Sequence, residues 1–157
     1  FWLTFGTLIT LFSGTFVSTT PGANLGCGVN GLFDSWPLCN GHLTEKIEDV
    51  IDQSQIIHRW FVVLMQLALF WASYKIWEEN SKNDSGNNLR FWIWSGTGVY
   101  FTNIIMGAFY VLSWTLDNGH IEILSLFHLL FAATSFLLLA TASLILTLEE
   151  REMSHSA

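Results

Sequence analysis

Hydrophobic residues in this chain gather into four long runs separated by polar segments. Each run is close to the roughly 20 residues that a helix needs to cross the ~30 Å hydrocarbon core of a bilayer. Helices are expected because lipid offers no partners to a broken backbone, and the short alternating segments typical of a β-barrel are missing from the sequence. The pattern predicts an all-α membrane protein, a bundle of four transmembrane helices. The runs cover residues 1–17, 56–77, 91–114 and 123–148.

Polar segments connect these runs within a single membrane domain of 157 residues. The first connection, residues 18–55, is long and holds both cysteines and both prolines. The second, residues 78–90, is short and polar, and the third, residues 115–122, is tight. A charged tail follows from residue 149. The chain therefore offers one large loop on which chemistry outside the membrane could be placed.

The basic residues predict the orientation of the chain. Cytoplasmic loops of membrane proteins carry an excess of Lys and Arg, and most basic residues here flank the second connection or the tail. We expect a multi-pass protein of the cell membrane, with both termini in the cytoplasm and the cysteine-bearing loop outside. The first run has no charge before Asp34, so it lacks the basic start of a signal peptide and is expected to be a retained helix. The cytoplasmic set is Lys75, Lys82, Arg90 and Arg151, and the opposite set is Lys46 and Arg59.

Composition agrees with a membrane protein and excludes other classes. Hydrophobic residues make up 51% of the chain and charged residues only 12%, against about 25% charged in an ordinary soluble domain. The chain's thirteen Phe and eight Trp suit a lipid environment, since amphipathic rings favour the membrane interface. The formal net charge of −7 argues against nucleic-acid binding, which needs a basic face. Membrane lipid is therefore the first expected partner.

Two cysteines, Cys27 and Cys39, lie in the long outer loop. A disulfide is plausible on the oxidising side of a membrane, and it is favoured over two free thiols because the chain has only these two. A metal site made by the pair alone would lack ligands.

Two histidines, His58 and His128, lie inside apolar runs, where ionisable groups are rare and usually functional. Both predicted helices start at the outer face, so the two residues differ in depth by about 4.5 Å at 1.5 Å rise per residue. Such a pair could hold an iron from opposite sides, or it could make polar contacts between helices. The remaining histidines are expected to be solvated: His42, His120 and His155.

Small residues recur on the helix face that carries His128. They leave room for a flat macrocycle, and they equally suit close helix packing. Leu139 is the one bulky side chain on this face, and the small residues are Ala132, Ser135 and Ala142.

Several motifs in the chain resemble one family. They are residues 14–17 (GTFV), 21–27 (PGANLGC) and 36–41 (WPLCNG), the pair His58-Arg59, and residues 106–109 (MGAF) and 126–129 (LFHL). Together they resemble the first half of heme A synthase, whose usual member has eight helices in two pseudo-symmetric halves. Half-length members of that family are known.

The resemblance implies a function and a set of site residues. His58 and His128 would be the axial pair of a heme, and Cys27 and Cys39 would form an outer disulfide linked to heme transfer or redox supply. Family members oxidise the methyl group of heme O to a formyl group, which gives heme A for cytochrome oxidase. We expect heme b as the bound cofactor, with heme O and heme A as alternatives.

One departure bears on catalysis. Where the family has an acidic residue three positions before the first histidine, this chain has Gln55, and an amide cannot move protons as a carboxylate can. Gln55 can still hydrogen-bond near a cofactor, so Gln55 and Arg59 are cofactor-binding candidates and no catalytic residue is assigned. The alternatives are a non-catalytic bis-histidine heme b subunit for electron transfer or structure, and a scaffold without cofactor. Because the resemblance covers one half, we also expect a homo-oligomer or a place in a respiratory-type membrane complex.

Overall fold

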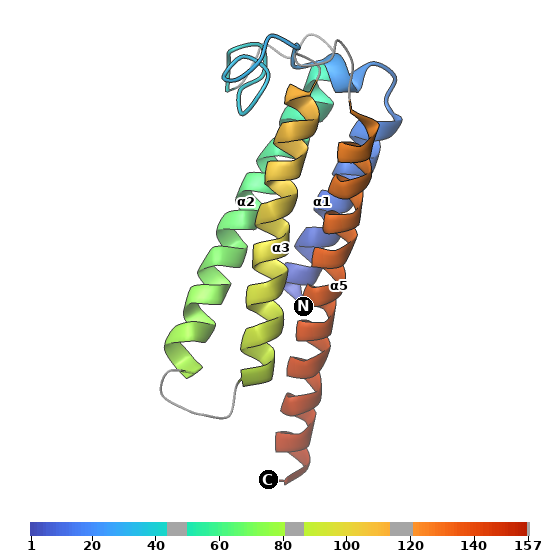
Figure 1. Ribbon diagram of the computed structural model, residues 1–157. Helices are drawn as coiled ribbons and strands as arrows, with labels where there is room; N and C mark the ends of the chain where they lie inside the picture. Colours follow the sequence, from blue (N-terminus) through green and yellow to red (C-terminus); the bar gives the residue numbers. More distant parts are fainter. Residues whose placement is uncertain (44–49, 81–86, 114–120, 157) are drawn as a thin grey trace.

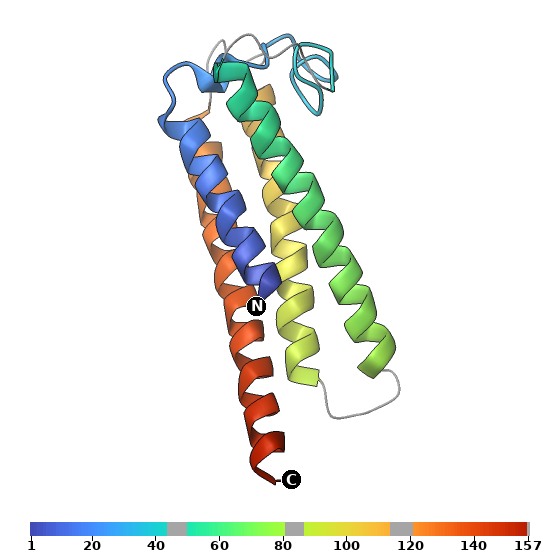
Figure 2. The same cartoon turned by 180° about the vertical axis from the view of Figure 1, so that it is seen from behind.

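The computed structural model describes residues 1–43, 50–80, 87–113 and 121–156, and these residues form a bundle of long helices (Figure 1). The predicted all-α fold with four long helices is confirmed over this part of the chain. The helices are α1 (Trp2–Thr19), α2 (Val50–Asn80), α3 (Asn87–Leu112) and α5 (Glu122–Ser156), with a short 3-10 helix η1 (Ala23–Leu25) after α1. Seen from behind, α1 lies across the bundle in front of α5 and beside α2 (Figure 2).

Two of the helices extend well beyond the apolar runs that predicted them. α2 begins at Val50, although its run begins at residue 56, and α5 continues to Ser156 through most of the predicted tail. An apolar run marks only the part of a helix that is buried in lipid, whereas Glu and Arg are good helix formers in water. Much of the predicted connections falls outside the described residues, namely residues 44–49, 81–86 and 114–120. The last of these ranges includes His120.

Three helices of the described chain are long and apolar enough to cross a membrane. These spans cover Trp2–Thr19, Gln53–Glu78 and Glu122–Glu152. The predicted multi-pass character is therefore confirmed. α3 is not among the three, so its crossing of the membrane stays a prediction.

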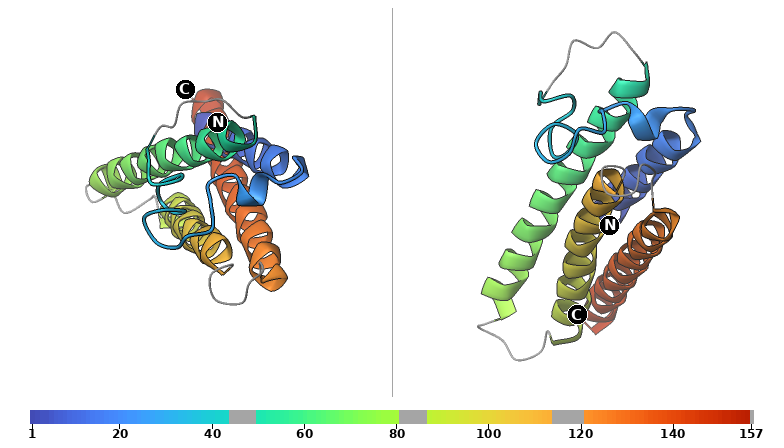
Figure 3. Two further views of the ribbon diagram at one scale, coloured as in Figure 1. Left: turned by 90° about the horizontal axis from the view of Figure 1, so that it is seen from above. Right: turned by 45° about the horizontal axis from the view of Figure 1, so that its top comes forward.

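The helices are arranged as two packed pairs. α1 packs against α2, and α3 packs against α5 along most of its length, while contacts of α2 with α3 and of α1 with α5 close the bundle (Figure 3). A buried cluster of Met65, Leu69, Tyr100 and Leu139 joins α2, α3 and α5 at its centre. This order places α2 and α5, the helices that carry His58 and His128, at diagonal corners.

The small-residue face of α5 is used for helix packing. The hydroxyl of Ser135 donates to the carbonyl of Gly96 on α3 at 3.0 Å, and Ser135 is fully buried. A Cβ at Gly96 would lie 2.8 Å from the Leu139 side chain, so α3 packs directly against this face of α5. Of the two predicted interpretations, close helix packing is therefore correct for the face of α5 around Ser135 and Leu139. This part of the face leaves no room for a macrocycle.

Candidate functional site

The first of the two intramembrane histidines is held by α1. His58 Nδ1 lies 2.8 Å from the hydroxyl oxygen of Ser13. That hydroxyl also lies 2.7 Å from the carbonyl of Thr10, and when it donates its only hydrogen there, Nδ1 is the donor toward Ser13. The ring also lies against Gly14, where a Cβ would come 3.1 Å from His58 Cε1. The proton is then placed on Nδ1, and Nε2 keeps its lone pair.

The second histidine is held in the same way by α3. His128 Nδ1 lies 2.9 Å from the backbone carbonyl of Asn103, and a carbonyl can only accept, so Nδ1 again carries the proton. The ring lies against Gly107, where a Cβ would come 2.9 Å from His128 Cε1. Each packed pair of helices therefore supplies one histidine whose ring lies against a glycine. Its Nδ1–H has a hydrogen-bond acceptor, and the lone pair of Nε2 remains available.

The two imidazoles come from α2 and α5, and they lie close enough to interact electrostatically. Within the described chain, neither Nε2 has a hydrogen-bond partner. An Nδ1–H that is fixed by an acceptor is the arrangement that metal-ligating histidines usually show, because it sets both the tautomer and the ring orientation. Each histidine can therefore offer one neutral imidazole nitrogen to a ligand.

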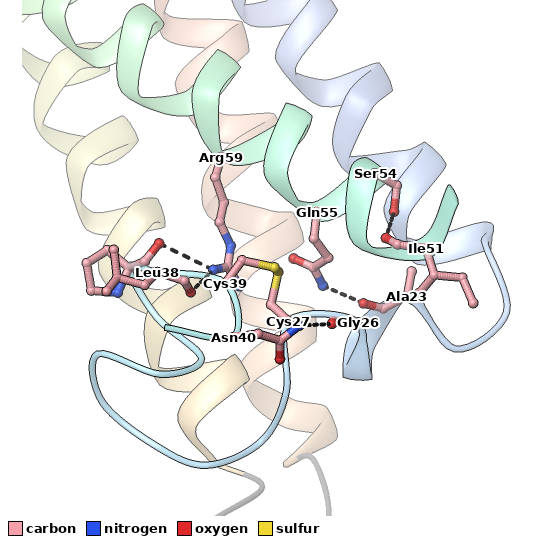
Figure 4. Close-up of a disulfide and its surroundings, with 11 residues drawn as sticks. Ala23, Gly26, Cys27, Leu38, Cys39, Asn40, Ile51, Ser54, Gln55 and Arg59 are labelled. Carbon is pink, nitrogen blue, oxygen red and sulfur yellow. Dashed lines mark hydrogen bonds between the residues drawn. A yellow bond between two sulfur atoms is a disulfide. The ribbon is translucent and has the colours of Figure 1, made fainter. Parts of the chain in front are cut away.

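The other candidate residues lie in the loop between α1 and α2 and on the first turns of α2, which Figure 4 shows. Cys27 and Cys39 form the predicted disulfide, and both are buried together with Ile56 near the start of α2. Gln55 Nε2 donates to the carbonyl of Ala23 at 2.7 Å, and Gln55 is itself buried. Arg59 Nη1 donates to two carbonyls on the other side of the disulfide, those of Pro37 and Leu38.

Gln55 and Arg59 therefore both hold the disulfide loop, a role that the sequence motif does not indicate. Gln55 uses its amide to hold the start of the loop, and in Figure 4 it points toward Ala23. Arg59 holds the end of the loop with one nitrogen, while its other terminal nitrogen, Nη2, is buried and has no hydrogen-bond partner in the described chain. Arg59 therefore has a charged donor left for an anion.

Beyond this pair, the described residues hold no group of three or more His, Cys, Asp and Glu side chains suited to a metal ion. His42 is exposed in the outer loop, and His155 is exposed near the end of α5, as expected for solvated residues.

Sequence reasoning missed the residues that hold the histidines. Ser13 and Asn103 are ordinary polar residues within apolar runs, and nothing in their spacing connects them to His58 or His128. Gly14 and Gly107 do lie in the GTFV and MGAF motifs. A glycine within a long apolar run was the available signal, since it permits the close approach of another helix.

No protein-family model, no curated protein and no solved structure matches this chain.

Proposed function

We propose that this protein is a heme-binding integral membrane protein in which His58 and His128 are the axial ligands. The observation that carries the proposal is the matched state of the two histidines. Each is partly buried between helices, each can donate Nδ1–H to an acceptor on a neighbouring helix, and each then keeps the Nε2 lone pair. An Nδ1–H fixed in this way leaves Nε2 as the nitrogen that a metal would take.

The surrounding residues fit such a group. A heme carries carboxylates besides its iron, and Arg59 offers the buried Nη2 that lacks a partner within the described chain. A charge-assisted bond to a carboxylate would satisfy that nitrogen. When bound, the heme would supply an iron that changes oxidation state by one electron. The residues of the chain would orient it and exclude water, with heme b as the expected form and heme O or heme A as alternatives.

The resemblance to heme A synthase adds an activity to this proposal, the oxidation of the heme O methyl group. The position of Gln55 favours the alternative, a non-catalytic bis-histidine heme b subunit for electron transfer or structure. Its amide is occupied by the loop carbonyl of Ala23, and an amide does not ionise near neutral pH, so it cannot serve as a general acid or base. Either function suits a homo-oligomer or a subunit of a respiratory-type membrane complex.

The test begins with the detergent-purified protein. A pyridine hemochrome spectrum and chromatography of the extracted heme are expected to give heme b at one per chain. Heme A or a hydroxylated intermediate beside it would favour the enzyme. A colourless protein that also fails to bind added hemin would contradict heme binding altogether.

The ligand assignment is tested by His58→Ala and His128→Ala. Each is expected to remove or shift the low-spin heme spectrum, because one axial imidazole is lost. His42→Ala is the matched control, since His42 is exposed in the outer loop. If both membrane variants keep the spectrum of the unmodified protein, His58 and His128 are not the ligands.

A further inference from the structure

A second feature of the molecule lies where α2 ends and α3 begins, at the end of the bundle opposite the disulfide loop (Figure 1). The Arg90 guanidinium carbon is stacked 3.7 Å from the centre of the Trp77 ring. The Trp94 ring meets Trp77 edge to face, with ring centres 6.0 Å apart. Together with Phe91 and Ser95 these residues line a surface depression of about 280 Å³.

Arg90 has no carboxylate partner among the side chains that the structure describes. None of those carboxylates lies within 4.0 Å of it, whereas nearby Lys75 pairs with Glu78 at 3.2 Å. Stacking on an indole uses the face of a guanidinium and leaves its N–H donors at the perimeter. These donors form a fork that matches the oxygens of a phosphate. The depression therefore combines an unpaired cation with an aromatic wall.

The position of the depression indicates which phosphate would reach it. Trp77 lies next to the end of the span Gln53–Glu78, so the depression is at the edge of the membrane. The aromatic side chains around it are open to the surroundings, with Phe91 62%, Trp77 50% and Trp94 43% exposed. Tryptophan at this level is typical of the zone where lipid headgroups meet acyl chains.

We propose that Arg90, Trp77 and Trp94 form a binding site for an anionic phospholipid. The phosphate accepts hydrogen bonds from Arg90, and an acyl chain lies along Trp94 and Phe91 toward the membrane interior. A net negative headgroup is preferred because the site offers one positive charge and no carboxylate within the described residues. A zwitterionic headgroup would bring its own cation beside Arg90.

The test uses the full chain in detergent, titrated with phosphatidylglycerol and with phosphatidylcholine of identical acyl chains. Lipid retained per chain is read by native mass spectrometry. We expect about tenfold preference for phosphatidylglycerol, the size of one charge-assisted contact. Arg90→Gln is expected to abolish this preference, and Arg90→Lys, which keeps the charge without the fork, to reduce it.

The controls are Lys75→Gln and Arg151→Gln, which remove a paired cation near the site and an exposed cation on α5. Both are expected to leave the preference unchanged. Equal binding of the two lipids by the unmodified protein, or an unchanged preference in Arg90→Gln, would overturn the proposal. Displacement of the lipid by millimolar inorganic phosphate would overturn it too, because a free phosphate would then be enough. Circular dichroism of each variant separates loss of lipid from loss of fold.

Discussion

The two histidines share one chemical state when the Ser13 hydroxyl donates its hydrogen to the carbonyl of Thr10. The carbonyl of Asn103 can only accept, so His128 carries its proton on Nδ1. Both imidazoles are then Nδ1–H tautomers with Nε2 available. Neither Ser13 nor Asn103 would touch the ligand itself. They act as positioning residues, and their effect is open to measurement through the properties of the bound heme.

Replacing Ser13 by alanine tests this role at a single atom. The Nδ1–H of His58 would lose its acceptor, which costs about 1–3 kcal/mol for a buried donor. The imidazole would also become a weaker electron donor, so we expect the midpoint potential of the bound heme to rise. Potentiometric titration measures the shift. Ser18→Ala is the control, because that hydroxyl is exposed and bonds only within α1. Equal midpoint potentials in the unmodified protein and both variants would show that Ser13 does not position a heme ligand.

Gly107 tests the fit of the second ring. The Cβ of an alanine at this position would lie 2.9 Å from His128 Cε1, so the ring or α3 would have to move. We expect Gly107→Ala to weaken or shift the low-spin heme spectrum and to destabilise the bundle by about 1–3 kcal/mol.

Gly98→Ala is the control for this prediction. It lies on the same helix, and a Cβ there meets nothing within 4 Å. It should keep the spectrum, and its better helix propensity should make it equal or higher in stability. The same heme spectrum in both glycine variants would mean that His128 does not need the room beside Gly107.

At the scale of elements, α2 anchors the disulfide loop at two points one helical turn apart. Gln55 holds the carbonyl of Ala23, which precedes Cys27, and Arg59 holds the carbonyls of Pro37 and Leu38, which directly precede Cys39. Ile56, between them, packs on the disulfide itself. The loop is thus fixed to the same turns of α2 that carry His58. A movement of the loop would therefore shift the position of His58.

Gln55→Glu tests the anchor. The family resemblance alone predicts that this change raises any oxidation of heme O. The structure adds a cost, because a carboxylate cannot donate to the carbonyl of Ala23. We expect the loop to loosen by about 1–3 kcal/mol and the disulfide to be reduced several-fold faster by dithiothreitol, read by alkylation of the released thiols. Gln53→Glu, two residues away, should react at the rate of the unmodified protein. Unchanged reduction in Gln55→Glu would show that the amide is not an anchor.

How far the sequence could predict these elements depends on the range of the interactions. Apolar runs identified all four long helices, because burial in lipid requires them residue by residue. The pairing of Cys27 with Cys39 was also accessible, since the chain offers no other partner. The ends of α2 and α5 were predicted too short because polar residues continue a helix outside lipid. The anchoring of Gln55 and the acceptors of His58 and His128 depend on how distant helices and a loop meet, which no local pattern records.

At the scale of the whole molecule, the bundle has two chemically different ends. One carries the disulfide loop and Arg59, and the other carries Arg90, Lys75 and the C-terminal end of α5 (Figure 1). Disulfides persist on the oxidising side of a membrane, and excess basic residues stay on the cytoplasmic side. Both rules predict the same orientation, with the loop outside and both termini inside, although they rest on unrelated chemistry.

Single introduced cysteines test this orientation. Both native cysteines are in the disulfide, so an added thiol is the only one free to react. Phe33→Cys in the outer loop and His155→Cys near the end of α5 both replace exposed side chains. In intact cells, a membrane-impermeant maleimide is expected to label residue 33 and not residue 155, and lysis should expose both. Labelling of residue 155 alone in intact cells would show that the protein has the opposite orientation in the membrane. The basic residues around Arg90 would then lie outside, and the disulfide would have to survive in a reducing compartment.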